Sequence, residues 1–271
     1  MSPTNDISLS ADDITPQHPE VEIRQAFTVT PFDPRNCFSL PIIITSFNRL
    51  TCLRQLVECL RSRGYWNLYV IDNASDYEPL LRYYIEASLP VFSLSKNVGC
   101  YALWQTTVGQ LFTSTYYALT DPDVVPISEC PDDFAAYFLR ILDYYPNVNK
   151  VGFGLRLDDI PRTQPLWSKI VRHELQFWKY PLAPNLYAAP IDTTFAVYRP
   201  GTNEAWVSAI RTAGIYLARH LPWYADTDRL PEDELYYQKT CRTSTHWTAW
   251  MKAARSIDTH GGCKDAHRRE S

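Results

Sequence analysis

The chain has 271 residues, of which 45% are hydrophobic, 21% charged and 14% aromatic, a composition typical of a globular protein with a sizeable core. Its net charge of −4 argues against a nucleic-acid-binding protein, which normally carries a basic excess. The same charge argues against attachment to anionic lipid by overall charge, although it leaves room for a local basic patch.

The sequence also predicts the compartment. No apolar run is long enough to cross a bilayer, and the first residues lack the basic and apolar regions of a secretory signal. The 7 cysteines include no Cys-x-x-Cys pair, which predicts buried thiols in a reducing compartment and no zinc site. We therefore expect a cytoplasmic protein without a transmembrane segment, which is compatible with peripheral contact at the inner face of a membrane.

Residues 1–36 are polar and contain prolines, so we expect a partly flexible N-terminal extension in which residues 21–29 form an edge strand or a helix. Apolar runs and helical periodicity then alternate. Strands are expected over residues 40–47, 68–73, 90–94 and 116–120, with helices over residues 53–64, 79–87 and 99–112. This alternation predicts an α/β fold whose mostly parallel sheet is connected by right-handed crossovers and flanked by helices.

Polar side chains follow each of these strands at the point where the strand ends. They are Thr45, Ser46, Asn48 and Arg49, then Asp72 and Asn73, then Lys96 and Asn97, and finally Asp121 and Asp123. Because parallel strands bring their carboxyl ends to one edge, where open α/β sheets bind ligands, the pattern predicts a nucleotide-type site.

The acids Asp121 and Asp123 flank a proline directly after an apolar strand. Two carboxylates at this spacing can hold a divalent cation, which in turn can hold a diphosphate. The alternative is an ordinary turn, in which Asp and Pro are common. The chain has only 9 glycines and lacks both a Walker loop and a Gly-x-Gly-x-x-Gly motif, so phosphate binding by a glycine loop is not expected.

Taken in order, these pieces resemble the N-terminal half of a GT-A glycosyltransferase, most closely the broad glycosyltransferase family 2. The resemblance covers residues 38–127 and rests on Ile42-Ile43-Ile44-Thr45-Ser46-Phe47-Asn48-Arg49, Val70-Ile71-Asp72-Asn73-Ala74-Ser75, Lys96-Asn97-Val98-Gly99 and Thr120-Asp121-Pro122-Asp123. It implies a GT-A, Rossmann-like fold with a nucleotide-sugar-binding half over residues 37–127 and an acceptor-side, catalytic half over residues 128–255, followed by a flexible tail over residues 256–271.

The resemblance also implies roles for individual residues. The base and ribose of the donor nucleotide would contact Thr45, Ser46, Arg49, Asp72 and Asn73. Asn97 and Gly99 would line the donor pocket, and Asp121 and Asp123 would bind Mn²⁺ or Mg²⁺ on the diphosphate. Many relatives carry a longer acidic cluster at this place, which is a departure of this sequence from the family.

The second half offers candidate acceptor and catalytic residues. Within it a helix is expected over residues 132–145, followed by strands over residues 151–157 and 191–198. Asp192 contacts the donor sugar or is a turn acid, and the aromatic segment over residues 173–187 is a sugar-binding wall or part of the core. The acids Asp158 and Asp159 are acceptor contacts or belong to a capped turn.

Glu232, Asp233 and Glu234 begin another predicted helix. Acids at a helix N-terminus are favourable electrostatically, which is one explanation for them. The other is that one of them is the catalytic base, since the resembling family carries its base in this region. We predict Asp233 as the base, with Glu232 and Glu234 as alternatives. His246 resembles a C-terminal histidine that completes the metal shell in several GT-A enzymes, or it is an ordinary surface residue.

The function predicted from these residues is a metal-dependent glycosyltransferase, for example of polysaccharide biosynthesis, which moves a sugar from a nucleoside-diphosphate sugar to a glycan or glycolipid hydroxyl with inversion. One alternative is a sugar-nucleotide nucleotidyltransferase, which the lack of glycine over residues 46–50 disfavours. The other is a non-catalytic carbohydrate-binding domain of the same fold, which the presence of both Asp121 and Asp123 disfavours.

Overall fold

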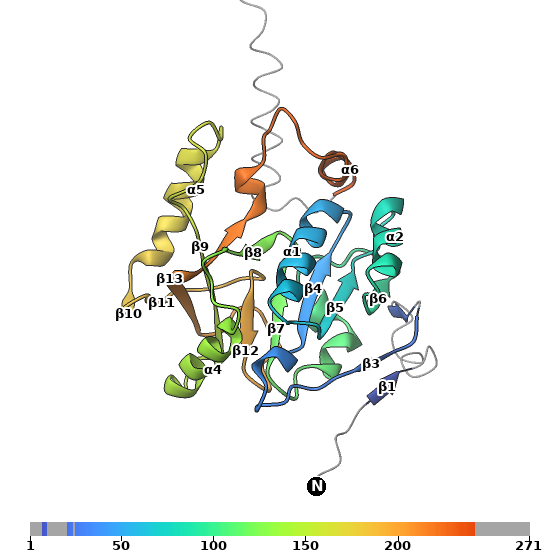
Figure 1. Ribbon diagram of the computed structural model, residues 1–271, viewed down its shortest axis with the longest axis horizontal. Coiled ribbons are helices and arrows are strands. Elements are labelled where there is room, and N and C mark those ends of the chain that lie inside the picture. The colour runs from blue at the N-terminus through green and yellow to red at the C-terminus, as the bar shows by residue number, and fades with distance from the viewer. Residues whose placement is uncertain (1–6, 10–20, 24, 242–271) are drawn as a thin grey trace, which may run out of the picture.

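The computed structural model describes residues 7–9, 21–23 and 25–241. Its centre is an 11-stranded mixed sheet with the order β10-β11-β13-β9-β12-β7-β4-β5-β6-β2, and β8 pairs with β13 beside this path (Figure 1). The strands are β2 (Val21–Ile23), β4 (Ile42–Ser46), β5 (Leu68–Asp72), β6 (Val91–Leu94), β7 (Tyr117–Thr120), β8 (Val124–Pro126), β9 (Lys150–Leu155), β10 (Pro181–Ala183), β11 (Leu186–Ala188), β12 (Ala196–Tyr198) and β13 (Ala209–His220). A separate two-stranded sheet pairs β1 (Ile7–Leu9) with β3 (Phe27–Val29).

The strands β7, β4, β5 and β6 are neighbours and run parallel. The helices are α1 (Leu50–Ser62), α2 (Glu78–Glu86), α3 (Ala102–Gln105), α4 (Phe134–Tyr144), α5 (Trp167–Glu174) and α6 (Glu232–Thr240), with short 3-10 helices η1 (Cys37–Ser39), η2 (Thr107–Leu111), η3 (Leu175–Trp178) and η4 (Leu221–Tyr224). The α/β fold predicted from the alternation of strands and helices is therefore confirmed.

The second half extends this parallel core. β12 runs antiparallel between β7 and β9, and β13 runs parallel to β9 before it pairs with β8. At the far edge β2 pairs antiparallel with β6, so the expected edge strand within residues 21–29 is confirmed. Antiparallel strands thus close both sides of the parallel sheet that carries the predicted site.

Two predicted elements are shorter than expected. The helix over residues 99–112 is broken into α3 and η2, because Thr106 between them has extended backbone angles (φ −129°, ψ 170°). Gly109 allows the two pieces to pack closely, since a Cβ atom there would lie 2.6 Å from the Leu103 carbonyl oxygen. The strand over residues 191–198 begins only at Ala196, because Asp192 accepts a hydrogen bond from the Thr194 backbone at 3.2 Å and forms a turn.

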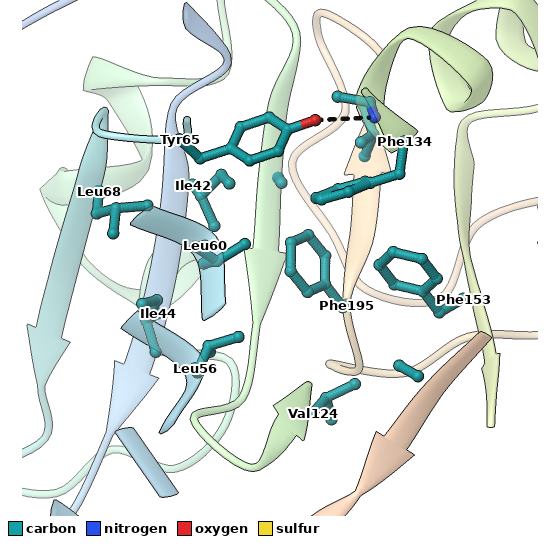
Figure 2. Packing of buried hydrophobic residues seen from close by; sticks show 14 of the residues in the cluster. Ile42, Ile44, Leu56, Leu60, Tyr65, Leu68, Val124, Phe134, Phe153 and Phe195 are labelled. Atoms are coloured by element: carbon teal, nitrogen blue, oxygen red, sulfur yellow. Dashed lines mark hydrogen bonds between the residues drawn. The ribbon is translucent and has the colours of Figure 1, made fainter. Parts of the chain in front are cut away.

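The sheet is buried on both faces, as the continuous apolar strands predict. Along β4, Ile42 and Ile44 join the core beneath α1, α2 and α4, whereas Ile43 joins a second core beneath α3 and η2. In the first core, shown in Figure 2, the Phe134 ring lies 5.1 Å from the ring of Phe153 and 5.6 Å from that of Phe195. These two contacts hold α4 within the second half, and the Phe134 ring also lies 4.7 Å from the ring of Tyr65 in the first half, which makes the two halves one packed unit.

We expect Phe134→Ala to lower the free energy of unfolding by about 3–5 kcal/mol, because Phe134 is fully buried and its truncation leaves a cavity. Tyr144→Ala at the other end of α4 is the matched control, since Tyr144 is 79% exposed. Urea denaturation of both variants measures the difference. Equal stabilities of the two variants would show that the aromatic contacts across the halves do not stabilise the fold.

Candidate functional site

Asn48 joins the first two strand ends of the candidate site. Its side-chain oxygen accepts hydrogen bonds from the backbone of Asp76 and Tyr77, both at 3.0 Å, and its amide donates to Asp76 at 2.8 Å and to Thr240 of α6 at 3.1 Å. Asn48 has φ 51°, a left-handed conformation that Asn tolerates better than most residues. The loop after β4 is therefore held against both the loop after β5 and α6.

Asn73 forms hydrogen bonds with the segment that follows β6. Its amide donates to the Gly99 carbonyl at 2.7 Å, and its oxygen accepts from the Val98 backbone at 2.8 Å. Asn97 in turn accepts from the Gly99 backbone at 2.9 Å. The structure thus brings together Asn73, Asn97 and Gly99, which the sequence assigned to one donor pocket.

The other predicted nucleotide contacts lie deeper in the sheet edge. Thr45 and Ser46 are buried at the end of β4, and the Thr45 hydroxyl has no hydrogen-bond partner in the described part of the chain. Asp72 is 1% exposed, and its carboxylate accepts from the Tyr84 hydroxyl at 3.0 Å and from the Ser75 backbone at 3.3 Å. In this structure Asp72 holds the loop that follows β5.

Arg49 lies at the centre of the charged groups on this edge. One guanidinium nitrogen, Nη1, donates to Asp123, while Nε and Nη2 donate to the two oxygens of Glu234 on α6 at 2.9 and 3.1 Å. The guanidinium also lies over the ring of Tyr237, 4.0 Å from the centroid. Burial disfavours the charge of Arg49, but Asp123 and Glu234 outweigh this effect and raise its pKa well above the ordinary value.

The pKa values of the two acids after β7 are shifted in opposite directions. Burial raises the pKa of Asp121 well above its ordinary value, and the negative charges of Asp123 and Asp192 add to that shift. Burial acts on Asp123 in the same direction, but His220 and Arg49 reverse it and hold the pKa of Asp123 below its ordinary value. The pKa values of the two acids are therefore shifted in opposite directions, and the lower one belongs to Asp123.

His220 is a site residue that the sequence analysis missed. β13 pairs with β8 so that His220 lies opposite Val124, and its Nε2 lies 3.5 Å from the Asp123 carboxylate. Its ring also packs against Trp223, with 4.9 Å between the ring centroids. Nothing local in the sequence marks this histidine, because the pairing that places it joins strands far apart in the chain.

A buried lysine holds the loop that contacts Asp121. Lys150 is fully buried and donates to the carbonyl oxygens of Asp192 at 3.0 Å and Ala205 at 2.7 Å. Burial lowers its pKa to about 7, and Asp192 opposes that shift. Thr193, which follows Asp192 in the chain, donates its hydroxyl hydrogen to Asp121 at 2.8 Å. Lys150 therefore fixes the loop whose threonine orients Asp121, while the Asp192 side chain is exposed.

The first turn of α6 packs on the N-terminus of α1. Asp233 is 4% exposed, and its two oxygens accept from the backbone and the hydroxyl of Thr51 at 2.8 and 2.7 Å. Glu232 beside it is exposed. The predicted base Asp233 thus already serves as an acceptor for α1. The predicted metal ligand His246 lies outside the described residues.

The donor set fits a hard cation. Asp123 Oδ1 is buried without a hydrogen-bond partner in the described ranges, which leaves a carboxylate oxygen available as a ligand. Within those ranges, no group of three or more His, Cys, Asp or Glu side chains has the arrangement of a metal site. A cation here would take Asp121 and Asp123 and complete its shell with water or phosphate oxygens, as Mg²⁺ commonly does.

No protein-family model and no curated protein matches the chain. Among solved structures, glucosyl-3-phosphoglycerate synthase from Mycobacterium tuberculosis in complex with Mn²⁺ and UDP-glucose is 13% identical, over 80% of this chain and 78% of that one, with a TM-score of 0.42. The same synthase with phosphoglyceric acid is 12% identical over 59% of this chain and 56% of that one, with a TM-score of 0.38.

A cytidylyltransferase from Leptospira borgpetersenii serovar Hardjo-bovis (strain JB197) is 11% identical over 84% of this chain and 99% of that one, with a TM-score of 0.35. All three TM-scores lie below 0.5. At such low similarity these neighbours carry no conclusion about the reaction, which has to be inferred from the site itself.

We expect Arg49→Met to lower the free energy of unfolding by about 3–5 kcal/mol, because the buried carboxylates of Asp123 and Glu234 lose their partner. The double variant with Glu234→Gln should recover part of this loss. Chemical denaturation measures both. Arg35→Met removes a surface ion pair whose arginine side chain is 89% exposed and serves as the control. A loss no larger than in this control would show that Arg49 does not hold the edge together.

Proposed function

We propose that this chain is a glycosyltransferase that moves a sugar from a nucleoside-diphosphate sugar to a hydroxyl of a glycan or glycolipid, with inversion at the anomeric carbon. The observation that carries the proposal is the acidic pair at the end of β7, in which Asp123 pairs with Arg49 and has a buried oxygen without a partner in the described ranges. This pair lies on the edge where the ends of four parallel strands meet, the usual ligand position in open α/β sheets.

The charge balance of this edge supports a cation-dependent donor. Arg49 is already matched by Asp123 and Glu234, so it has no surplus positive charge for a diphosphate. A diphosphate would approach the Asp123 carboxylate and be repelled unless a cation is held there. When bound by Asp121 and Asp123, Mn²⁺ or Mg²⁺ would stabilise the charge that develops on the departing diphosphate.

The chain's own residues would prepare the donor pocket. Thr193 orients Asp121 through its hydroxyl, and Arg49 keeps Asp123 ionised. Asn73 holds the segment that contains Asn97 and Gly99 against the sheet, which fixes one wall of the pocket. Nucleotide recognition by Thr45 and Asp72 belongs to the same proposal, supported for Thr45 by its buried hydroxyl without a partner.

The proton acceptor is proposed on the first turn of α6. An inverting transfer needs one carboxylate that takes the proton of the attacking hydroxyl. Of the three candidates from the sequence, Glu234 is paired with Arg49 and both oxygens of Asp233 accept hydrogen bonds from Thr51, whereas Glu232 is exposed. This difference favours Glu232 as the base and gives Asp233 the role of anchoring α6 to α1.

We expect one of UDP, GDP, dTDP and CDP to bind only in the presence of Mn²⁺, because Arg49 is already paired with Asp123 and Glu234 and the Asp123 carboxylate would repel the diphosphate. Asp123→Ala should weaken this binding by at least about tenfold, since it removes the ionised ligand. Isothermal titration calorimetry with each nucleotide, with and without Mn²⁺, measures both effects.

Asp143→Ala is the matched control for this titration, because Asp143 is an exposed acid on α4. It should leave nucleotide affinity unchanged. Absence of binding by every nucleotide to the folded protein, or equal binding by Asp123→Ala, would refute the donor site at the acidic pair. The carbohydrate-binding alternative would then be tested with glycans directly.

A comparison of Glu232→Ala with Asp233→Ala separates the catalytic from the anchoring carboxylate. We expect Glu232→Ala to lower kcat for donor hydrolysis by about 10²–10⁴-fold at unchanged stability. Asp233→Ala should lower the free energy of unfolding by about 1–2 kcal/mol, because Thr51 loses its acceptors.

Thr51→Ala, which removes one of these two hydrogen bonds from the other side, should destabilise the protein in the same direction. If Asp233→Ala instead abolishes turnover and leaves stability unchanged, Asp233 is the base, as the sequence alone suggested, and the anchoring role is wrong.

A further inference from the structure

Residues 160–191, which we call the basic arm, differ in charge from the rest of the protein. They contain the four basic residues Arg162, Lys169, Arg172 and Lys179 and a single acid, Glu174, a net charge of +3 within a chain of net charge −4. The arm comprises α5, η3, β10 and β11 and lies on the side of the molecule opposite α2 (Figure 1).

The positive charges of the basic arm face outward, whereas its acid does not. All four basic residues are exposed. On α5, Lys169 and Arg172 are three residues apart and so share one face, while Ile170 and Glu174 on the opposite face are buried. Glu174 pairs with Arg211 of β13, and these side chains are only 2% and 5% exposed. Glu174 therefore points away from the surface that carries the four basic residues.

The basic arm also carries exposed apolar side chains. Leu175, Tyr180 and Leu182 are 52%, 69% and 45% exposed, and Lys179 lies between the first two in the chain. They belong to the end of the arm formed by η3 and β10, and β10 is the last strand of the sheet. Basic residues beside exposed aliphatic and aromatic ones are the pattern of surfaces that lie in a membrane interface.

We propose that the basic arm binds the surface of an anionic lipid bilayer. Lys169, Arg172 and Lys179 would contact lipid phosphates, while Tyr180 and Leu182 would enter the region between headgroups and acyl chains. The bilayer is favoured over a nucleic acid because a phosphate backbone offers no place for the exposed Leu182. No helix in the described ranges has the length and apolar character of a membrane-spanning segment, so contact would be confined to the surface.

The size of the effect can be estimated from the charges. Each Lys or Arg near an anionic surface strengthens binding by about 1 kcal/mol, or about fivefold. Removal of three such charges should therefore weaken binding about 100-fold. Added salt should weaken binding of the natural protein, because the charge attraction is screened within a Debye length.

The test is sedimentation of the full chain with vesicles of phosphatidylcholine alone and of phosphatidylcholine mixed with phosphatidylglycerol. We expect binding to the mixed vesicles only. The triple variant Lys169→Gln, Arg172→Gln, Lys179→Gln should lose about 100-fold in affinity, and the double variant Tyr180→Ser, Leu182→Ser should bind more weakly than the natural protein at high salt. All five positions are exposed, so circular dichroism should show unchanged folding.

Matched controls lie elsewhere on the surface. Arg54→Gln, Arg82→Gln, Arg140→Gln removes the same charge from exposed positions outside the arm, and Ile85→Ser removes an apolar side chain that is 73% exposed. Both should bind vesicles as the natural protein does.

Three outcomes would overturn the proposal. The natural protein fails to sediment with anionic vesicles, or the control triple variant loses as much affinity as the arm variant. In the third outcome, the natural protein does not bind vesicles, and sedimentation velocity shows that it is a dimer which the arm variants convert to a monomer. This result would assign the arm to self-association. None of these readouts depends on glycosyl transfer, so the proposal stands or falls independently of the catalytic function.

Discussion

The arrangement of the candidate site depends on one buried cation, the guanidinium of Arg49. It pairs with Asp123 of the strand edge and with Glu234 of α6 at the same time, so it favours the charged form of Asp123 and fixes the position of the helix that covers the edge. Burying three charged groups together costs solvation energy that only near-ideal geometry repays. The paired hydrogen bonds to Glu234 and the Tyr237 ring beneath the guanidinium supply such geometry.

The acidic pair shows how burial can divide two like residues into two roles. Both aspartates are buried at the end of β7, but His220 and Arg49 stabilise the charge of Asp123, whereas Asp121 faces the charges of Asp123 and Asp192. Two carboxylates this close in a poorly solvated place do not both ionise without another cation. One guanidinium does not balance the charges of both Asp123 and Glu234, which makes the edge receptive to a ligand that brings its own positive ion.

The parts of this picture that were predictable from the sequence are local. Apolar runs marked the parallel strands, and polar residues after them marked the edge where Asn73, Asn97 and Gly99 in fact meet. His220 could not be predicted, because its position follows from the pairing of β13 with β8. The contact between Asp233 and α1 could not be predicted for the same reason, since Thr51, the partner of Asp233, is 182 residues away in the sequence. Sequence patterns report secondary structure and burial, not the pairing of distant segments.

The attachment of α6 has a consequence for folding. Glu234 and Thr240 contact residues that precede them by 185 and 192 positions, so loop closure over most of the chain must come before these hydrogen bonds form. During synthesis the parallel strands and their acids are complete long before α6 leaves the ribosome. The ligand-binding edge is then one of the last regions to reach its final state, and a chain that ends before α6 would present an open, acid-lined sheet edge instead of a closed site.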